Sequence, residues 1–371
     1  MKKNKLGIYT HVPFCVRKCA YCDFYSLSDR SSISLYADAV VKQLGEKSGE
    51  FEAYTVDTVF FGGGTPSLLP PEEFEKIASV IYKNFDTDSD LEFSAEVNPA
   101  TVTNGHLDAF LRSGVNRVSV GMQSALDAEL RTLSRIHTFD EFISTYDLIR
   151  NRGIKNINID LMYGIPDQTI ETLAETLEKT VALSPEHISA YGLKIEPDTY
   201  FGRHTYEYSF PDDDLQSDMY LYICSFLAEK GYERYEFSNF AKPGYECRHN
   251  LKYWNRDEYL GIGPAAASFI GGKRYTYTRD LDAYINNVQF KAEPELEESR
   301  YIDNEEAENE RIMLGLRLTK GIVPDDGLIS SSEQYIKDGY MKYNGGRLCF
   351  TEKGVLVSNY ILSDLITDRK A

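Results

Sequence analysis

Three cysteines, Cys15, Cys19 and Cys22, lie within eight residues of the chain in the pattern CxxxCxxC. A structural zinc site is closed by four tetrahedral ligands, which usually come as CxxC pairs, whereas this loop offers no obvious fourth ligand. Soft thiolates also bind iron–sulfur clusters, and three thiolates on a [4Fe-4S] cluster leave one iron open to a further molecule. The spacing therefore predicts a cluster with an exchangeable iron. A loop without metal, or with zinc, is the less favoured alternative.

The other three cysteines, Cys224, Cys247 and Cys349, are scattered along the chain and are predicted to be buried or free thiols. In a cytosolic chain of this length, clustered cysteines are more often metal ligands than disulfide partners. The N-terminal sequence MKKNKLGIYTHV lacks the apolar core of a secretory signal. No apolar run approaches the roughly 18 residues that span a bilayer. We therefore expect a cytoplasmic protein without an integral membrane segment.

The composition disfavours one class of partner. The chain has 371 residues and a net charge of −18, from 58 acidic and 40 basic residues. Binding to the phosphate backbone of nucleic acid depends on a basic face that releases counterions, so we expect no nucleic-acid partner. The length favours roughly two domains of about 150 residues each.

The elements that must position the cysteines form an alternating pattern of β-rich and helical segments. Strands are predicted at residues 6–12, 56–63, 91–99, 117–124, 157–164 and 187–195, and helices at 34–46, 71–85, 104–114, 139–153 and 169–183. Six βα repeats imply a parallel sheet, and nearly continuous apolar strands imply burial on both faces. Six units suit an open, partial (β/α)6 barrel of the α/β class better than a full eight-stranded barrel.

The pattern divides the chain into three parts. Residues 1–230 are predicted to be the partial barrel, 231–300 a barrel extension that contains the sequence HNLKYW, and 301–371 a small α-rich C-terminal domain. Within these parts, residues 215–230, 309–318 and 353–366 are predicted to be helical. The acidic run 293–310 is predicted to be a solvated connection or the start of a helix.

Polar residues and glycines stand where the predicted strands end, which is the edge that carries the chemistry of α/β barrels. They are the three cysteines, Gly62, Gly63, Gly64, Thr65, Glu96, Asn98, Gln123 and Asp160. Because the carboxyl ends of parallel strands meet at one edge of the sheet, we expect these residues to converge on a single site.

With this arrangement, the CxxxCxxC loop after the first strand resembles that of the radical S-adenosylmethionine (SAM) superfamily. The resemblance implies a [4Fe-4S] cluster whose open iron holds the methionine amine and carboxylate of SAM. The sequence GGGTPS at residues 62–67 is similar to the superfamily's glycine motif, where a backbone without Cβ atoms approaches the methionine ammonium. The fold implied is the radical SAM partial barrel.

The residues at the remaining strand ends are similar to those in one branch of that superfamily, the oxygen-independent coproporphyrinogen III oxidase group. Glu96, Gln123, Arg135 and Asp160 occur in the order seen there, and Tyr9 and Tyr21 match positions beside the cluster and the cofactor. The resemblance implies that SAM is contacted by Tyr9, Gly63, Gly64, Thr65, Glu96, Gln123, Arg135 and Asp160, with Tyr21 next to the cluster.

Two groups within the branch differ in sequence motifs that can be compared with this chain. The coproporphyrinogen-oxidising enzymes have a fourth cysteine two positions after the third and a longer segment before the cluster, whereas this chain has Phe24 at that position and fourteen residues before Cys15. The HemW haem chaperones have CxxxCxxCxF and HNxxYW. Here the second motif is His249, Asn250, Tyr253 and Trp254.

By this resemblance, HNLKYW implies part of a haem site. The His249 imidazole is a suitable axial ligand for haem iron, and Tyr253 and Trp254 offer flat apolar surface to the macrocycle. From the residues alone, a packed aromatic loop with a hydrogen-bonded core histidine is the alternative. Cys247 is a second candidate ligand or attachment point, although no CxxCH motif is present.

The resemblance therefore implies a haem chaperone that binds haem, the cluster and SAM and passes haem to an unidentified haem-accepting protein, without coproporphyrinogen oxidase activity. The alternative is a coproporphyrinogen III oxidase (dehydrogenase), in which a 5'-deoxyadenosyl radical abstracts hydrogen from the propionates before decarboxylation. A radical enzyme acting on RNA is disfavoured by the charge of −18. Similar proteins usually end in a longer winged-helix-like unit, so the C-terminal domain is expected to be trimmed.

Overall fold

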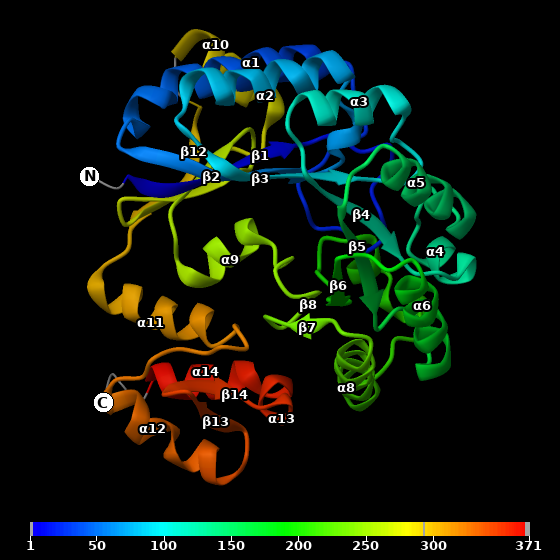
Figure 1. Ribbon diagram of the computed structural model, residues 1–371, viewed down its shortest axis with the longest axis vertical. Helices are drawn as coiled ribbons and strands as arrows, with labels where there is room; N and C mark the ends of the chain where they lie inside the picture. Colours follow the sequence, from blue (N-terminus) through cyan, green and yellow to red (C-terminus); the bar gives the residue numbers. More distant parts are fainter. Residues whose placement is uncertain (1–2, 292–293, 368–371) are drawn as a thin grey trace.

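The computed structural model describes residues 3–291 and 294–367 (Figure 1). Its centre is a run of six parallel strands that pair in sequence order. They are β1 (Asn4–Val12), β2 (Tyr54–Gly63), β3 (Thr87–Val97), β4 (Arg117–Gln123), β5 (Asn156–Tyr163) and β6 (His187–Gly192). The predicted parallel sheet of an open α/β barrel is confirmed.

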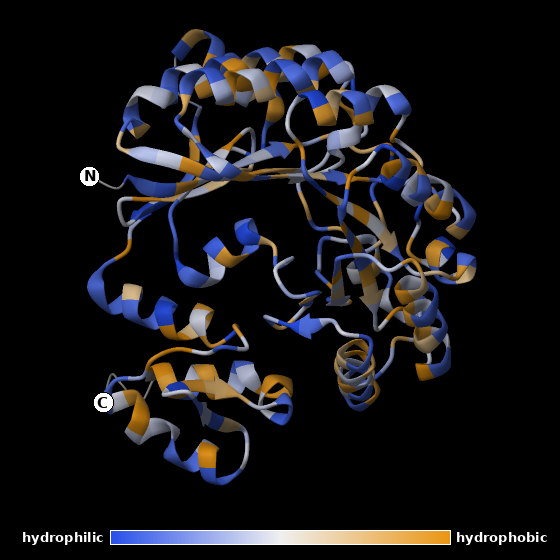
Figure 2. Cartoon of the chain, viewed as in Figure 1, coloured by the Kyte–Doolittle hydropathy of each residue, from blue (hydrophilic) through white to orange (hydrophobic). Residues whose placement is uncertain are grey.

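Helices cover the outer, convex face of this curved sheet (Figure 1). They include α1 (Ile33–Lys47), α2 (Pro71–Asn84), α3 (Asn104–Arg112), α4 (Asp127–Thr132), α5 (Phe139–Asn151), α6 (Ile170–Ala182) and α8 (Asp213–Glu229). Figure 2 shows polar and apolar residues interspersed along these helices, as expected of helices with one buried face. All except the short α4 fall within a predicted helix or overlap one.

The starts of three of these helices are set by local sequence. The side chains of Thr103, Thr138 and Thr169 each accept a hydrogen bond from the backbone three residues later, at the beginning of α3, α5 and α6. In each case the side chain of that later residue also reaches back to the capping residue, which satisfies two backbone donors at once. These boundaries follow the chain's own sequence and need no tertiary contact.

The segment 231–300 lengthens the sheet at both edges. On one side β8 (Asn239–Ala241) pairs antiparallel with β6, and β7 (Glu233–Arg234) pairs with β8. On the other side β9 (Tyr259–Ile262) pairs parallel with β1, followed by antiparallel β10 (Ala267–Ile270), β11 (Lys273–Tyr277) and β12 (Leu296–Tyr301). The helix α10 (Leu281–Lys291) lies between β11 and β12 in the sequence.

The acidic run 293–310 is only partly a connection. Its first half forms the edge strand β12, and α11 (Asn304–Gly315) begins three residues after that strand ends. Every residue of β12 is exposed, so the strand lacks the alternation of buried and exposed positions that reveals a strand in a sequence. The predicted start of a helix is confirmed, the connection is wrong for β12, and Glu293 lies outside the described residues.

The HNLKYW sequence forms a helix, α9 (Arg248–Asn255), inside the curve of the sheet (Figure 1). The Glu92 carboxylate on β3 accepts hydrogen bonds from the backbone N–H groups of Arg248 and His249, both at 3.0 Å. Gly7 on β1 allows the helix to approach, because a Cβ at this position would lie 2.8 Å from the Lys252 side chain. The aromatic loop of the sequence-based alternative is therefore helical.

The C-terminal part is a small helical unit with one hairpin. After α11 it contains α12 (Asp326–Lys337), β13 (Met341–Asn344), β14 (Arg347–Phe350), α13 (Glu352–Leu356) and α14 (Ser358–Thr367). Glu310 on α11 pairs with Arg256, which follows α9, and with Arg274 on β11. Over the described part of the chain, no helix has the length and apolar character needed to cross a bilayer.

Candidate functional site

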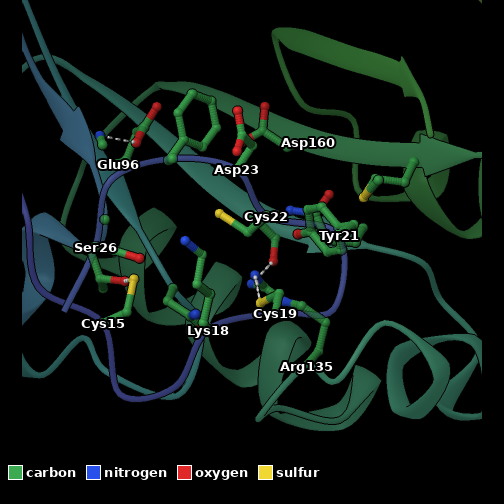
Figure 3. Close-up of a pocket in the computed structure, with 18 of the residues that line it drawn as sticks. Cys15, Lys18, Cys19, Tyr21, Cys22, Asp23, Ser26, Glu96, Arg135 and Asp160 are labelled. Atoms are coloured by element: carbon green, nitrogen blue, oxygen red, sulfur yellow. Dashed lines mark hydrogen bonds between the residues drawn. The ribbon is translucent and has the colours of Figure 1, made fainter. Parts of the chain in front are cut away.

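A cavity of about 470 Å³ opens at the carboxyl ends of the parallel strands (Figure 3). Loops and strand ends from β1 to β6 contribute to its wall. Among the lining residues are Cys15, Cys19, Tyr21, Cys22, Gly63, Gly64, Thr65, Glu96, Asn98, Gln123, Arg135 and Asp160. The predicted convergence is confirmed for the strand-end residues except Gly62, which does not line this space. We call the space the outer cavity.

The loop that carries the three cysteines is held to the barrel by backbone and side-chain contacts. The Cys15 N–H donates to the Leu27 carbonyl at 2.9 Å, and the Ala20 N–H donates to the Leu133 carbonyl at 3.2 Å. The Cys15 Sγ lies 3.6 Å from the Thr65 hydroxyl at the end of β2. These contacts therefore hold the loop that carries the thiols in place against the barrel.

Burial favours the protonated form of two of these thiols when no metal is bound. It raises the pKa of Cys22 to about 11 and also raises the pKa of Cys15. The Cys19 Sγ accepts a hydrogen bond from Arg135 at 3.6 Å, so a cation already stands beside one sulfur. Binding of a metal cluster would release protons from the loop.

The arrangement of sulfurs suits a cluster better than a single ion. Among the residues that the structure describes, no three His, Cys, Asp or Glu side chains lie close enough together to hold one metal ion. Thiolates on a cubane cluster each bind a different iron, so they surround a volume and do not meet at one point. Cys15, Cys19 and Cys22 line one cavity in this way. The donor set thus fits the predicted cluster.

Polar atoms in the wall of the outer cavity lack partners. The Arg135 Nε and the Asn98 Oδ1 are buried and make no hydrogen bond to the described residues, although another nitrogen of Arg135 donates to the Gly121 carbonyl at 2.8 Å. Gln123 has a φ of 70°, which is unusual for a residue other than glycine. Since buried polar groups are normally satisfied, these atoms fit a polar ligand.

Two buried carboxyl groups lie deeper in the wall. Glu96 accepts a hydrogen bond from the Gly63 N–H at 3.1 Å, and burial together with the charge of Asp160 raises its pKa to about 8. Asp160 accepts hydrogen bonds from Ser119 at 2.9 Å and Asn158 at 2.7 Å. Burial raises the pKa of Asp160, and these hydrogen bonds oppose that rise. Such carboxyl groups can bind the amine or hydroxyl groups of a ligand.

The glycine motif has a packing role in addition to the one expected from the sequence. Gly63 has a φ of 104°, and a Cβ there would lie 2.5 Å from the His11 ring. A Cβ on Gly64 would lie 2.6 Å from the Phe14 carbonyl oxygen. The end of β2 can therefore pass beneath the cysteine loop only without side chains at these positions.

A second, smaller space of about 260 Å³ lies next to the outer cavity and shares several lining residues with it, including Phe24, Glu96 and Asp160. We call it the inner cavity. Its wall also contains Tyr9, Phe60, Arg117, Asn158, Ser189, Tyr191, His249, Asn250 and Tyr253. Tyr9 thus lines the inner cavity and not the outer one, unlike the other residues expected to contact SAM.

His249 is a buried histidine whose two ring nitrogens are both engaged. The side chain is 1% exposed, its Nδ1 lies 2.9 Å from the Thr58 hydroxyl, and its Nε2 lies 3.0 Å from the Tyr253 hydroxyl. Burial, with Lys252 and Arg117 nearby, lowers its pKa to about 3. The imidazole is therefore neutral, and iron could bind it only after one of these hydrogen bonds is replaced.

The structure separates Trp254 from Tyr253, which the sequence-based interpretation placed together against a macrocycle. Neighbouring residues on a helix point in directions about 100° apart. Tyr253 lines the inner cavity, whereas Trp254 packs against the Arg317 guanidinium, 5.5 Å from the ring centroid, and lines neither the inner nor the outer cavity. The two rings therefore do not line the same cavity in this structure, and their contact with haem stays a prediction.

Cys247 is fully buried and lies outside both cavities. Its thiol donates to the Glu92 carboxylate at 3.7 Å, and burial raises its pKa to about 12. The thiol is thus protonated and already has a partner. Cys224 and Cys349 are likewise buried and free, as expected.

Sequence reasoning missed a histidine near the cysteine loop. His204 follows the short helix α7 (Tyr200–Arg203), and its Nδ1 is 2.8 Å from the Tyr200 carbonyl oxygen. Its ring stacks on Tyr200 at 4.1 Å between centroids. The Phe201 N–H donates to the Ala20 carbonyl at 3.0 Å, which ties this segment to the cysteine loop. The only signal was the aromatic run YFGRHTYEYSF.

Comparisons with known proteins agree with this geometry. Residues 9–180 match the family model of the Radical SAM superfamily. Proteins named heme chaperone HemW are 31% identical in Lactococcus lactis, covering 99% of both chains, and 32% identical in Bacillus subtilis, covering 95% of this chain and 97% of the relative. The HemW of Escherichia coli is 35% identical over 80% of each chain.

A solved structure shares the fold. Coproporphyrinogen III oxidase (HemN) from Escherichia coli, described as a radical SAM enzyme, superposes with a TM-score of 0.85. The alignment covers 99% of this chain and 91% of that one, with 22% sequence identity. At this identity the likeness concerns the architecture alone.

Proposed function

Because this chain belongs to the HemW haem chaperone family of the radical SAM superfamily, we propose that it is a haem chaperone. In this proposal it binds haem together with a [4Fe-4S] cluster and SAM, and it transfers haem to an acceptor protein in the cytoplasm. The observation that carries the proposal is the similarity to several HemW proteins over nearly the whole chain. Six free cysteines support a reducing compartment.

The residues proposed to hold the cluster are Cys15, Cys19 and Cys22. When bound, the cluster would supply an open iron for the amino-acid end of SAM. Arg135 would orient the ligand and keep a positive charge beside Cys19, while Glu96 and Asp160 would accept or donate hydrogen bonds at its amine and hydroxyl groups. Gly63, Gly64, Thr65, Gln123, Tyr21 and Tyr9 complete the proposed surroundings.

The alternative, a coproporphyrinogen III oxidase, has only a shared fold in its support. Phe24 occupies the position of the oxidases' fourth cysteine, is 66% exposed and lines both cavities. Anaerobic incubation of the cluster-loaded protein with coproporphyrinogen III and SAM, followed by chromatography, distinguishes the two functions. We expect unchanged substrate. Decarboxylated product formed with consumption of SAM would replace the chaperone proposal with the oxidase.

For haem iron we keep His249 as the proposed axial ligand, with rearrangement of its bond to Tyr253. His204 is the second candidate, because its Nδ1 is engaged by a carbonyl and its Nε2 makes no hydrogen bond to the described residues. A hydrogen bond from one ring nitrogen to a carbonyl orients the imidazole and leaves the other nitrogen to bind a metal.

Three variants separate these ligands: His249→Ala, His204→Ala and, as a control away from both cavities, His106→Ala. The ligand variant should shift the Soret band and release haem faster, while the cluster content stays unchanged. If neither His249→Ala nor His204→Ala alters the spectrum or the off-rate, both assignments are wrong and Cys247 is the next ligand to test.

A further inference from the structure

Arg117 is a buried cation without a partner. It begins β4, is 2% exposed, and lines the inner cavity. Its Nε is buried without a hydrogen bond, and the guanidinium makes no hydrogen bond or ion pair with any residue of the described chain. A buried charge is strongly unfavourable unless it is paired. The barrel interior therefore holds a positive charge that forms no direct ion pair with the described residues.

The nearest acidic groups are committed elsewhere. Glu92 receives the two N–H groups at the start of α9 and the Cys247 thiol. Asp160 receives the Ser119 hydroxyl and the Asn158 amide. Both influence Arg117 through space, but neither reaches it as an ion pair. The place beside the guanidinium is open to an anion from outside the protein.

The rest of the inner cavity favours an oxyanion at this end. The side-chain amide of Asn250 lines the cavity and has no hydrogen-bond partner among the described residues. Ser189 lines it too. Two carboxyl groups, Glu96 and Asp160, also line this cavity. Burial and the charge of Asp160 raise the pKa of Glu96 to about 8, so it is mostly neutral near pH 7. Asp160 is the remaining negative neighbour.

We propose that Arg117, with Asn250, forms a carboxylate-binding subsite at the base of the inner cavity. A guanidinium binds a carboxylate with two parallel hydrogen bonds. The space of about 260 Å³ falls below the roughly 300–1,000 Å³ of pockets for drug-sized ligands, but it is large enough for a carboxylate arm of a larger ligand. The shared residues Phe24, Glu96 and Asp160 place it next to the outer cavity.

Two sources offer this chemistry. One is a propionate arm of haem, and this part of the inference rests on the proposed function. The other is a small free carboxylate, which needs no haem at all. Both require the charge of Arg117.

The first experiment compares haem with haem dimethyl ester, which keeps the ring and masks both carboxylates. Wild-type protein should bind haem about tenfold or more tightly than the ester, a difference of roughly 1.4 kcal/mol. Arg117→Gln should bind both alike, with the affinity that wild type has for the ester. Arg234→Gln, on β7 and outside both cavities, is the control and should behave as wild type.

The second experiment measures thermal unfolding in propionate and in the uncharged propionamide. If propionate alone stabilises wild type, and Arg117→Gln abolishes the effect while haem and its ester bind alike, the subsite takes a free carboxylate. If wild type binds haem and its dimethyl ester with equal affinity, and propionate and propionamide have equal effects on its thermal unfolding, the subsite does not exist. Both comparisons in wild type stand even if Arg117→Gln does not fold.

Failure of the proposed function gives a different result. In that case neither haem nor its ester binds wild type, whereas the propionate comparison still tests Arg117.

Discussion

Burial changes the pKa values of single residues in this site more than neighbouring charges do. Glu96 has a folded-state pKa of about 8, against an ordinary value of 4.5. The folded state therefore prefers the protonated carboxyl. Its contribution to stability is complete below about pH 4.5 and is lost as the pH rises through about 8.

Glu96→Gln should remove this pH dependence, because an amide does not ionise. We expect the variant to gain stability over wild type as the pH rises from 5 to 8, on the order of 1 kcal/mol per pH unit. Urea unfolding across this range measures the difference. Glu178→Gln, at an exposed position of α6, is the control. Parallel profiles for Glu96→Gln and wild type would show that the carboxyl is ionised in the folded protein.

The sequence was informative for residues whose neighbours follow from topology. Cys15, Glu96 and Asp160 stand at strand ends, and parallel strands bring such ends together. The partners of His249 were inaccessible to this reasoning, because Thr58 lies 191 residues away. Arg117 was missed for a similar reason, since a charged residue at the start of a strand is read as solvent-exposed unless its surroundings are known.

At the level of elements, α9 depends on a carboxylate from a distant strand. Glu92 occupies the N-terminus of the helix, where a negative charge and hydrogen-bond acceptors stabilise the first turn. Because this cap lies more than 150 residues away, the helix start signals that a sequence offers were absent. The same applies to β8, because its pairing with β6 is a long-range contact.

Glu92→Ala should therefore loosen α9, since two buried N–H groups and the Cys247 thiol lose their acceptor. We expect a loss of about 1–3 kcal/mol of stability and faster hydrogen exchange in α9. Asp90→Ala is the matched control, because Asp90 lies on the same strand, binds Arg248 and is 94% exposed. Equal effects of the two variants would rule out the cap as the cause.

A second element-level prediction concerns the attachment of the C-terminal unit. Glu310 on α11 pairs with Arg256 and Arg274, so Glu310→Gln should weaken this junction by about 1.5–3 kcal/mol. Hydrogen exchange should rise in α11 and at the start of β11. Glu308→Gln, which affects a pair within the same helix, should leave β11 unchanged. An unaltered exchange pattern in Glu310→Gln would mean that other contacts carry the junction.

At the scale of the whole molecule, six parallel strands bring together a three-thiol loop, a polar outer cavity and an inner cavity that contains a buried arginine. The division into a barrel at 1–230, an extension at 231–300 and a C-terminal unit at 301–371 stays a proposal. The middle segment supplies strands to both edges of the same sheet. The alternation of β-rich and helical segments predicted the α/β class, but the two added edges depend on long-range pairing that no local pattern encodes.

Anaerobic reconstitution tests the cluster for the molecule as a whole. We expect about four iron and four sulfide per chain, and loss of the cluster in Cys15→Ala, Cys19→Ala and Cys22→Ala. Cys349→Ala, which changes a buried thiol of the C-terminal unit, should keep it. One zinc per chain without charge-transfer absorption would contradict the cluster.

The central claim is that this chain carries haem, and a haem titration of the cluster-loaded protein tests it most directly. The account predicts saturable binding at about one haem per chain, with a Soret band distinct from that of free haem and with the cluster content unchanged. A linear, unsaturable rise in absorbance that matches free haem would contradict the account.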